Sequence, residues 1–221
     1  MRPWKIVAAG EGGQGIQALA ETLALAAYRA GLQSLYIPNF GIEQRGGVSL
    51  AFVQISPAPI GSPKFLRADL VAALSPRALR RSGQYLGPET FLLYDNSLID
   101  APQISDEVVG LQSYDTIAPE AFAERSSYRD RRPAVEAPSR CLVAVAASDL
   151  ARQRLHPRVF NMIILGAIVE ITGAVTLEQV KEALEEKLDR RFKKDPRLRE
   201  HNFAALELGA AAVKEKATAQ A

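Results

Sequence analysis

The sequence predicts an α/β fold with a mostly parallel, Rossmann-like sheet, and three observations lead there. An apolar strand at residues 4–9 runs into a glycine-rich turn at residues 10–15 and then a helix that Gly31 ends. A second strand at residues 32–37 follows, so this part of the chain is a βαβ unit, whose crossover should be right-handed. Further short apolar strands alternate with helix signals along the rest of the chain.

The first helix is predicted from apolar residues at helical spacing. They are Ile16, Leu19, Ala20, Leu23 and Ala27. Four further alanines keep the helix thin, so it can pack closely on a sheet. Pro38 is expected to end the second strand.

Further strands are predicted where short apolar runs lie between turn signals. They are residues 48–56, 68–74, 90–94, 108–111 and 142–147. Ser75 and Pro76 fit a helix N-cap followed by proline at the first helical position, so we expect a helix from there to about residue 85.

Three longer helices are expected in the last third of the chain, after a short one at residues 149–155. Residues 160–171 are apolar almost all round, with Asn161 as the polar exception, which predicts a buried helix. Thr176 and Gln179 form a capping box that opens a helix to about residue 190. A final helix is expected to begin after Asn202.

Size and composition narrow the class of protein. The 221 residues, 48% of them hydrophobic, fit one domain with a real core. A net charge of only +2 gives no electrostatic case for nucleic-acid binding. No signal-peptide pattern and no membrane-length apolar run is present, so we expect a soluble cytoplasmic protein that contacts no membrane. The single cysteine, Cys141, excludes an internal disulfide framework.

We expect residues 1–221 to form a single domain that carries an Arg-rich loop or arm at about residues 124–140. Five arginines in that stretch face three acidic residues, with two prolines. The stretch fits a solvated, mobile loop. It also fits an arm that docks on a partner or an anionic ligand.

The glycine turn is the first candidate site, because a helix N-terminus after a glycine turn can hold an anion. Gly10, Gly12 and Gly15 match the spacing of a dinucleotide-binding fingerprint. That fingerprint also expects an acid at the end of the second strand, and the nearest acid is Glu43, inside another glycine loop. The dinucleotide match is therefore incomplete. A P-loop is excluded because no Gly-Lys-Ser/Thr follows the turn.

Candidate catalytic groups are few. His156 and His201 have no metal-ligand spacing, and Cys141 opens an apolar strand, where it is expected to pack. Glu43 and Arg45 could orient or neutralise a ligand, or pair with each other or with a partner surface. By its own residues the chain is predicted to be a binding or scaffolding subunit with no catalytic residue and no metal site.

Several blocks of sequence together resemble the gamma subunit (or gamma domain) of the 2-oxoacid:ferredoxin oxidoreductases, of the pyruvate, 2-ketoisovalerate and 2-oxoglutarate type. They occur in the family's order and span nearly the whole chain. The blocks lie at residues 10–15, 40–47, 53–56, 59–60, 68–71, 161–167 and 202–209.

The resemblance implies a three-layer α/β unit within a complex that oxidatively decarboxylates a 2-oxoacid to acyl-CoA, CO2 and reduced ferredoxin. It places thiamine diphosphate, magnesium and iron–sulfur clusters on alpha and beta subunits, and on a ferredoxin-like delta subunit where one is present. Coenzyme A is the co-substrate, and the turn would suit its pyrophosphate. The candidate contacts to coenzyme A or to a partner subunit are Gly12, Gly13, Gln14, Gly15, Glu43, Arg45 and Gly46.

Two departures from the family pattern leave alternatives open. Gln44 before Arg45 resembles the indolepyruvate (aryl-pyruvate) branch, whereas residues 41–43 resemble the pyruvate and oxoglutarate branch. The Arg-rich stretch is also longer than the family's usual connection. Two interpretations of other classes remain, a stand-alone dinucleotide-binding protein and a non-enzymatic scaffold that pairs with itself.

Overall fold

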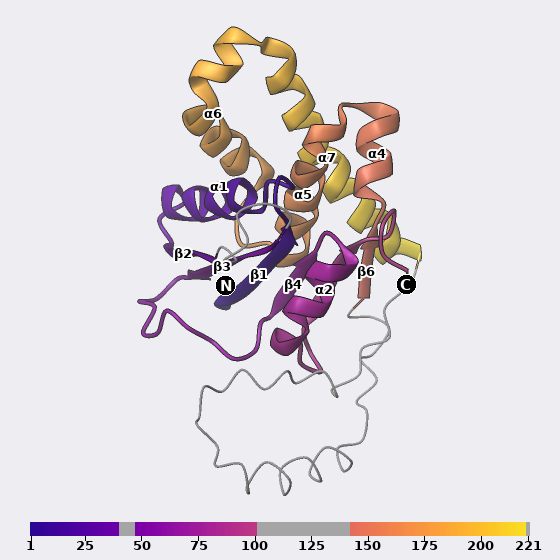
Figure 1. Cartoon of the computed structure of the whole chain (residues 1–221). Helices are drawn as coiled ribbons and strands as arrows, with labels where there is room; N and C mark the ends of the chain where they lie inside the picture. The colour runs from indigo at the N-terminus through magenta and orange to yellow at the C-terminus, as the bar shows by residue number, and fades with distance from the viewer. Residues whose placement is uncertain (40–46, 101–141, 220–221) are drawn as a thin grey trace, which may run out of the picture.

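The protein is built on one twisted sheet (Figure 1). The structure, a computed structural model, describes residues 1–39, 47–100 and 142–219. Across those residues six strands lie in the order β2-β3-β1-β4-β5-β6. Their bounds are β1 Trp4–Glu11, β2 Gln33–Asn39, β3 Val48–Ser56, β4 Leu70–Ala73, β5 Phe91–Asp95 and β6 Leu142–Val145.

Only one of these described strands runs against the others. β1, β4, β5 and β6 pair in parallel, whereas β3 pairs antiparallel with both β1 and β2. The prediction of a mostly parallel sheet is therefore confirmed. The βαβ unit is also present, but β3 lies between its two strands, which the sequence did not indicate.

Pro38 was expected to end the second strand, and this was wrong. β2 continues to Asn39, with Pro38 opposite Ala51 of β3. Among the described strands β2 has a single neighbour, β3, and lies at the edge of the sheet. A proline at an edge costs little because a strand there has one side without ladder hydrogen bonds.

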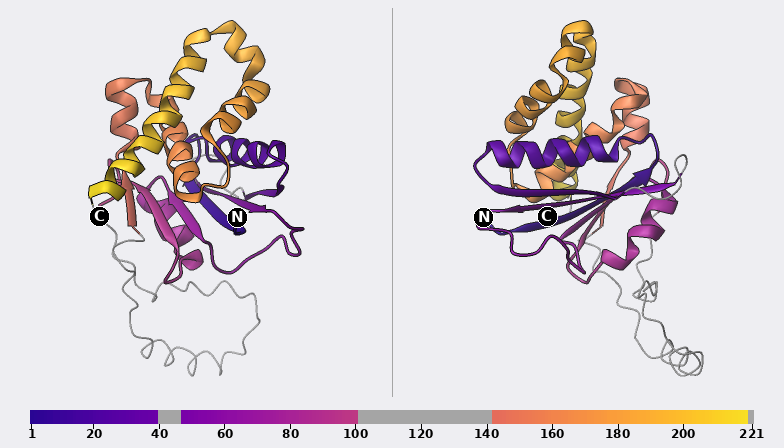
Figure 2. Two further views of the ribbon diagram at one scale, coloured as in Figure 1. Left: turned by 180° about the vertical axis from the view of Figure 1, so that it is seen from behind. Right: turned by 60° about the vertical axis from the view of Figure 1, so that its left-hand side comes forward.

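Helices cover the two faces of the sheet unequally, as Figure 2 shows. On one face lie α1 (Ile16–Arg29), α4 (Ala147–Arg154), α5 (Phe160–Thr172), α6 (Leu177–Lys194) and α7 (Pro196–Ala219). On the other lie α2 (Pro76–Ser82) and the short 3-10 turn η1 (Gly83–Tyr85). This is the three-layer arrangement that the family resemblance implied.

Side chains alternate between two hydrophobic cores along the central strand β1. Ile6 and Ala8 belong to the large core under α1 and α5, whereas Val7 and Ala9 belong to the smaller core under α2. All four are fully buried. The sheet therefore separates the two cores.

α5 and α7 cross with their backbones in direct contact. A Cβ atom on Gly166 of α5 would overlap the carbonyl oxygen of Leu206. Reciprocally, a Cβ on Gly209 of α7 would overlap the carbonyl oxygen of Ile163. The predicted buried helix at residues 160–171 is confirmed. Its close approach to the backbone of α7 requires a glycine on each of the two helices.

The predicted helix caps are confirmed in detail. Ser75 Oγ accepts from Ala78 N at 3.2 Å, with Pro76 at the start of α2. Thr176 Oγ1 accepts from Gln179 N at 3.2 Å, and Gln179 Oε1 accepts from Thr176 N at 2.9 Å. Both ends of the reciprocal capping box are therefore made.

The start of the last helix was predicted too late in the chain. α7 begins at Pro196, and Asp195 Oδ1 accepts from Arg197 N at 3.1 Å, in the manner of an N-cap. Asn202 lies inside the helix, where its amide donates to the carbonyl of Leu198 at 2.6 Å. An asparagine that satisfies its side chain within the helix in this way does not mark a helix start.

Some predictions fall outside the described residues. These are the short strand at 108–111, the Arg-rich stretch at 124–140, Cys141 and most of the second glycine loop. The single-domain organisation of residues 1–221 stays a prediction.

Candidate functional site

The glycine turn lies at the point of the sheet where the connections change sides. β1 and β4 are parallel neighbours, but α1 leaves β1 toward one face and α2 leaves β4 toward the other (Figure 2). In open α/β sheets, ligands bind in the crevice outside the carboxyl ends of such a strand pair. The turn therefore occupies the position in this fold best suited to a binding site.

Two glycines of the turn have backbone angles that other residues rarely adopt. Gly13 has a φ of 94° and Gly15 a φ of 76°. Gln14 N donates to the carbonyl of Glu11 at 3.0 Å, which closes the turn. Gly15 is the N-cap of α1 and has no side chain with which to cap it. The first amides of α1 therefore lack a side-chain acceptor from the N-cap position, and they can serve an anion.

Gln14 joins the ends of the neighbouring strands β1 and β4. Its Oε1 accepts from Glu11 N at 2.6 Å, and its Nε2 donates to the carbonyl of Leu74 at 3.2 Å. Glu11 ends β1, and Leu74 follows β4. The amide group is thus used within the protein, and Gln14 ties the end of β1 to the end of β4.

Gly15 is held by a residue from the far end of the chain. Asn161 of α5 donates through Nδ2 to the carbonyl of Gly15 at 3.3 Å. A Cβ atom on Gly15 would overlap that same amide nitrogen. A Cβ on Gly10 would likewise overlap the side chains of Ile16 and Gln14. Gly10 and Gly15 are therefore required for packing, whatever the turn binds.

Gly12 and Gly13 form the exposed side of the turn. Gly12 N donates to the carbonyl of Gly47 at 3.0 Å. Gly47, the last residue of the second glycine loop, therefore lies against the glycine turn. Around Gly13 no atom of the described residues lies within 4 Å of where a Cβ would be. Three predicted site residues, Glu43, Arg45 and Gly46, lie outside the described residues.

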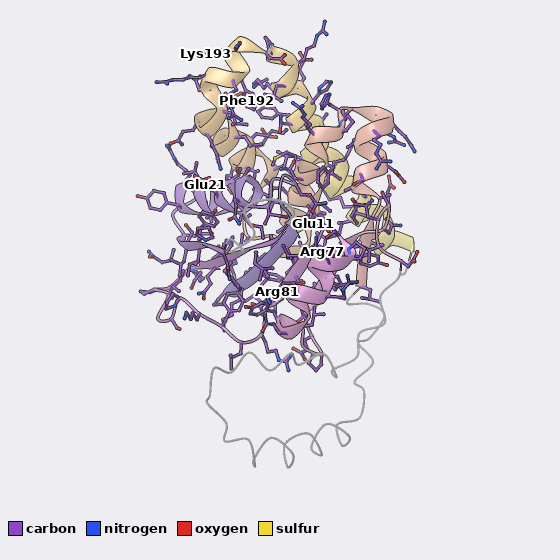
Figure 3. The ribbon with its side chains drawn as sticks, in the orientation of Figure 1. Glu11, Glu21, Arg77, Arg81, Phe192 and Lys193 are labelled. Atoms are coloured by element: carbon purple, nitrogen blue, oxygen red, sulfur yellow. The ribbon has the colours of Figure 1, made fainter. Side chains whose placement is uncertain are left out.

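One ion pair lies beside the turn, and sequence reasoning missed it. Arg77 Nη1 of α2 lies 3.9 Å from Glu11 Oε2, and both side chains are partly exposed (Figure 3). The arginine offsets the negative charge that Glu11 would place next to a bound anion. A signal existed, because Arg77 follows the predicted cap at Ser75 and so had to lie near the carboxyl end of β4.

A polar anchor holds α1 in place over the sheet. Tyr36 donates to Gln17 Oε1 at 2.7 Å, and Gln17 Nε2 donates to Ser49 Oγ at 2.6 Å and to the carbonyl of Leu50 at 3.0 Å. The N-terminus of α1 is thereby fixed relative to β3. Burial, and after it the nearby charge of Glu21, raises the pKa of Tyr36 above its ordinary value.

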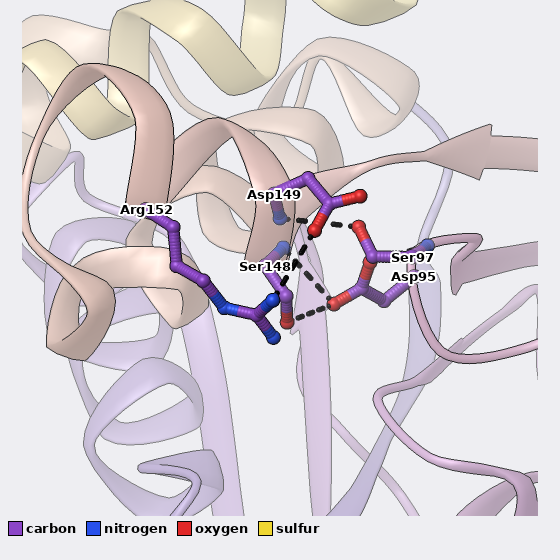
Figure 4. A network of polar contacts seen from close by, with 5 residues as sticks. All are labelled: Asp95, Ser97, Ser148, Asp149 and Arg152. Carbon is purple, nitrogen blue, oxygen red and sulfur yellow. Dashed lines mark hydrogen bonds and ion pairs between the residues drawn. The ribbon is translucent and has the colours of Figure 1, made fainter.

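Farther along the same edge, a buried carboxylate ties β5 to α4 (Figure 4). Asp95 is fully buried; its Oδ2 accepts from Ser148 N at 3.1 Å and from Ser148 Oγ at 2.6 Å. Its Oδ1 accepts from Ser97 N at 3.1 Å, and Ser97 Oγ accepts from Asp149 N at 3.1 Å. Both carboxylate oxygens are used, so Asp95 acts as a brace and cap for α4.

The two histidines are brought together, though not as a metal site. The rings of His156 and His201 stack with centroids 6.3 Å apart, and His156 Nδ1 accepts from Arg158 N at 3.2 Å. No group of three or more His, Cys, Asp or Glu side chains within residues 1–39, 47–100 and 142–215 is placed to hold a metal. None of the helices in the described part of the chain is both long and apolar enough to cross a membrane.

Comparison with known proteins agrees with this geometry. The family model described as pyruvate ferredoxin/flavodoxin oxidoreductase matches residues 5–212. The pyruvate/ketoisovalerate oxidoreductases common subunit gamma of Thermococcus kodakarensis is 30% identical over 177 residues, which cover 80% of this chain and 82% of that one. The pyruvate synthase subunit PorC of Methanothermobacter marburgensis is 26% identical over 177 residues, which cover 80% of this chain and 82% of that one.

Solved structures share the fold over almost the whole chain. The gamma subunit of a keto/oxoacid ferredoxin oxidoreductase from Geobacter sulfurreducens has a TM-score of 0.66 at 23% identity, covering 96% of this chain and 99% of that one. The 2-oxoglutarate:ferredoxin oxidoreductase of Magnetococcus marinus, with 2-oxoglutarate, coenzyme A and succinyl-CoA bound, has a TM-score of 0.71 at 25% identity. That match covers 97% of this chain and 32% of the longer chain.

The fold, the blocks of sequence and the relatives therefore agree. The chain belongs to the pyruvate ferredoxin/flavodoxin oxidoreductase family, as a gamma subunit of the 2-oxoacid:ferredoxin oxidoreductases.

Proposed function

We propose that this chain works in a cytoplasmic complex that oxidatively decarboxylates a 2-oxoacid with coenzyme A, giving an acyl-CoA, CO2 and reduced ferredoxin. Its partners are alpha and beta subunits, and a ferredoxin-like delta subunit where one is present. The observation that carries the proposal is the family match over residues 5–212. Relatives named for pyruvate and ketoisovalerate support a 2-oxoacid as the substrate class.

The residues of this chain do not fit the redox cofactors of such a complex. An iron–sulfur cluster usually needs about four cysteine thiolates, and the chain has one cysteine, Cys141. We therefore assign thiamine diphosphate, magnesium and the clusters to partner subunits, and assembly and coenzyme A binding to this chain. Isolated, it should not turn over.

The glycine turn fits the anionic part of coenzyme A. The N-terminus of α1 has no side-chain cap and offers backbone amides, and at Gly13 no described atom would keep a phosphate from the backbone. Arg77 offsets the nearby charge of Glu11. Glu43, Arg45 and Gly46 stay predicted contributors, since their loop ends at Gly47 against the turn.

A charge-matched pair of variants tests this site. Gly13→Asn and Gly13→Asp differ by one charge, so a phosphate-binding turn should lose more coenzyme A affinity in the aspartate variant, by roughly tenfold. Gly31 is the matched control, because its φ of 78° is also positive and its surroundings are equally open. Gly31→Asn and Gly31→Asp should leave the KM for coenzyme A of the assembled complex unchanged.

Equal KM values for all four variants would remove the turn from coenzyme A binding and leave it as a packing or docking element. The subunit assignment is tested separately by co-purification with thiamine- and cluster-bearing chains. Turnover of NADH by the isolated chain would contradict that assignment and restore the dinucleotide interpretation.

A further inference from the structure

An excess of positive charge lies at the junction of α6 and α7, in residues 189–199, which we name the hairpin tip. It lies away from the sheet, as Figure 1 shows. It contains six basic and two acidic side chains, whereas the whole chain has 27 basic and 25 acidic ones. Outside the hairpin tip, acidic residues therefore outnumber basic ones.

Internal pairing uses only part of this positive charge. Lys193 Nζ pairs with Asp189 Oδ2 at 2.9 Å, and Arg199 pairs with Glu185. The remaining basic side chains are Arg190, Arg191, Lys194 and Arg197. All four are exposed, and no acidic partner for them is found among the described residues.

Part of the cluster has an ordinary explanation in helix electrostatics, but part does not. Arg191, Lys193 and Lys194 lie in the last turn of α6, where cations interact well with the helix dipole. Arg197 lies in the first turn of α7, where a cation is unfavourable. The N-cap Asp195 binds the backbone N of Arg197, and no ion pair of the Arg197 guanidinium is found among the described residues. A side chain that opposes the local rule in this way fits a contact outside the chain.

The hairpin tip is held in place rather than loose. Phe192, labelled in Figure 3, is buried, with 6% of its surface exposed. It packs edge-to-face on Phe203 with ring centroids 6.2 Å apart. The Arg199 guanidinium lies 4.4 Å from the Phe203 ring centroid. The charges are thus presented on a preorganised support, which lowers the cost of binding.

The composition of the hairpin tip defines the kind of partner. Its aromatic residue, Phe192, is buried, and Leu198 is half-buried, so it offers no ring for stacking nucleic-acid bases and no apolar side chain for a membrane. Permanent interfaces bury apolar cores that this surface lacks. Charge alone fits a protein with an acidic face that binds and leaves quickly.

We propose that the hairpin tip is the reversible docking site for an acidic face of the protein that accepts electrons from the complex. This inference rests on the proposed function, because the acceptor is the one protein partner that must arrive and depart in every catalytic cycle. The basic side chains steer the acceptor and orient it. They take no part in the chemistry.

The test uses the assembled complex and two electron acceptors, ferredoxin and the small dye methyl viologen. The triple variant Arg190→Gln, Lys194→Gln and Arg197→Gln should raise the KM for ferredoxin roughly tenfold at low salt and flatten its salt dependence. Its kcat, and its rate with methyl viologen, should not change. A charge-matched control replaces three exposed basic residues elsewhere, Lys5→Gln, Arg80→Gln and Arg154→Gln, and should keep the parent KM.

A second variant separates docking from stability. Arg197→Glu should leave the melting temperature of the chain equal or higher, because it places an acid in the first turn of α7, and should still raise the KM for ferredoxin. Unchanged KM in both variants would overturn the proposal. Dissociation of the triple-variant complex on gel filtration would also overturn the proposal, because it would mark a permanent interface. A third contrary result would be that the parent chain binds a DNA duplex and the triple variant does not.

The proposed function fails in a different way from the docking site. If the parent complex reduces neither acceptor, both proposals fall. If it reduces methyl viologen and ferredoxin normally and the triple variant does the same, only the docking site is wrong.

Discussion

Glycines occupy two very different places in this chain, the turn after β1 and the crossing of α5 with α7. At the crossing, Gly166 and Gly209 are surrounded by backbone atoms that cannot move aside. In the turn, Gly15 faces one flexible side chain, Asn161, and Gly13 faces open space. The same residue type thus serves close packing in one region and backbone access in the other, and the turn itself contains both uses.

The difference shows that a glycine motif is not one signal. A fingerprint such as Gly10, Gly12 and Gly15 is commonly interpreted as a ligand site as a whole. Here Gly10 and Gly15 are needed for packing, whereas Gly12 and Gly13 are the exposed ones. Variants that measure stability and binding separately can sort the glycines into these two groups.

The largest effect is expected at the helix crossing. Gly209→Ala places a methyl group on the carbonyl of Ile163, and the two helices must separate, which should cost about 3 kcal/mol of the free energy of unfolding. The melting temperature should fall by about 6–12 °C in a chain of this size. Gly61→Ala is the control, since nothing lies near that position. A loss no greater than that of the control would mean that the backbones do not touch.

A smaller loss in the free energy of unfolding, about 2 kcal/mol, is expected for Gly15→Ala. The positive φ disfavours alanine, and the Asn161 side chain must shift. A double-mutant cycle with Asn161→Ala isolates the steric part. In the Asn161→Ala background the penalty should shrink by about 1 kcal/mol, measured by urea unfolding. An additive result would assign the whole penalty to the backbone angle.

Gln14→Leu should lower the free energy of unfolding by about 1–2 kcal/mol. It removes the hydrogen bonds to Glu11 N and to the Leu74 carbonyl, while the side-chain volume stays similar. Gln153→Leu serves as its control, as that side chain is exposed on α4. If both variants unfold at the same urea concentration, the link that Gln14 makes between β1 and β4 does not stabilise the fold, and its side chain becomes a candidate ligand contact.

The smallest effect on stability is expected at Gly13. Gly13→Asn and Gly31→Asn have similar backbone angles and open surroundings, so their free energies of unfolding should agree within about 0.5 kcal/mol. A clear excess loss at Gly13 would move it into the packing group and would weaken the case for an open binding turn.

Much of the fold was predictable because its signals are local. β3 has the predicted bounds at Val48–Ser56, and the caps at Ser75 and Thr176 form as expected. These features depend on neighbouring residues, whose spacing is visible in the sequence. The position of β3 between β1 and β2 was not predictable in this way, because strand order depends on contacts between distant segments.

The candidate site was predictable only in part, for the same reason. The turn could be located from its glycines, but the partner of Gly15 is Asn161, 146 residues away along the chain. Likewise, the carboxylate of Asp95 caps a helix that begins far beyond it at Ala147. Contacts between residues this far apart decide which glycines and which acids have a structural role. They cannot be inferred from the spacing of neighbouring residues.

The brace at Asp95 also has a consequence for how the protein can be engineered. Asp95 and Ser97 bind Ser148 and Asp149, so the chain entering and the chain leaving residues 101–141 are fastened to each other. Engineering of the protein should therefore leave Asp95, Ser97 and Ser148 unchanged, because a substitution at any of them weakens the link between the end of β5 and the start of α4.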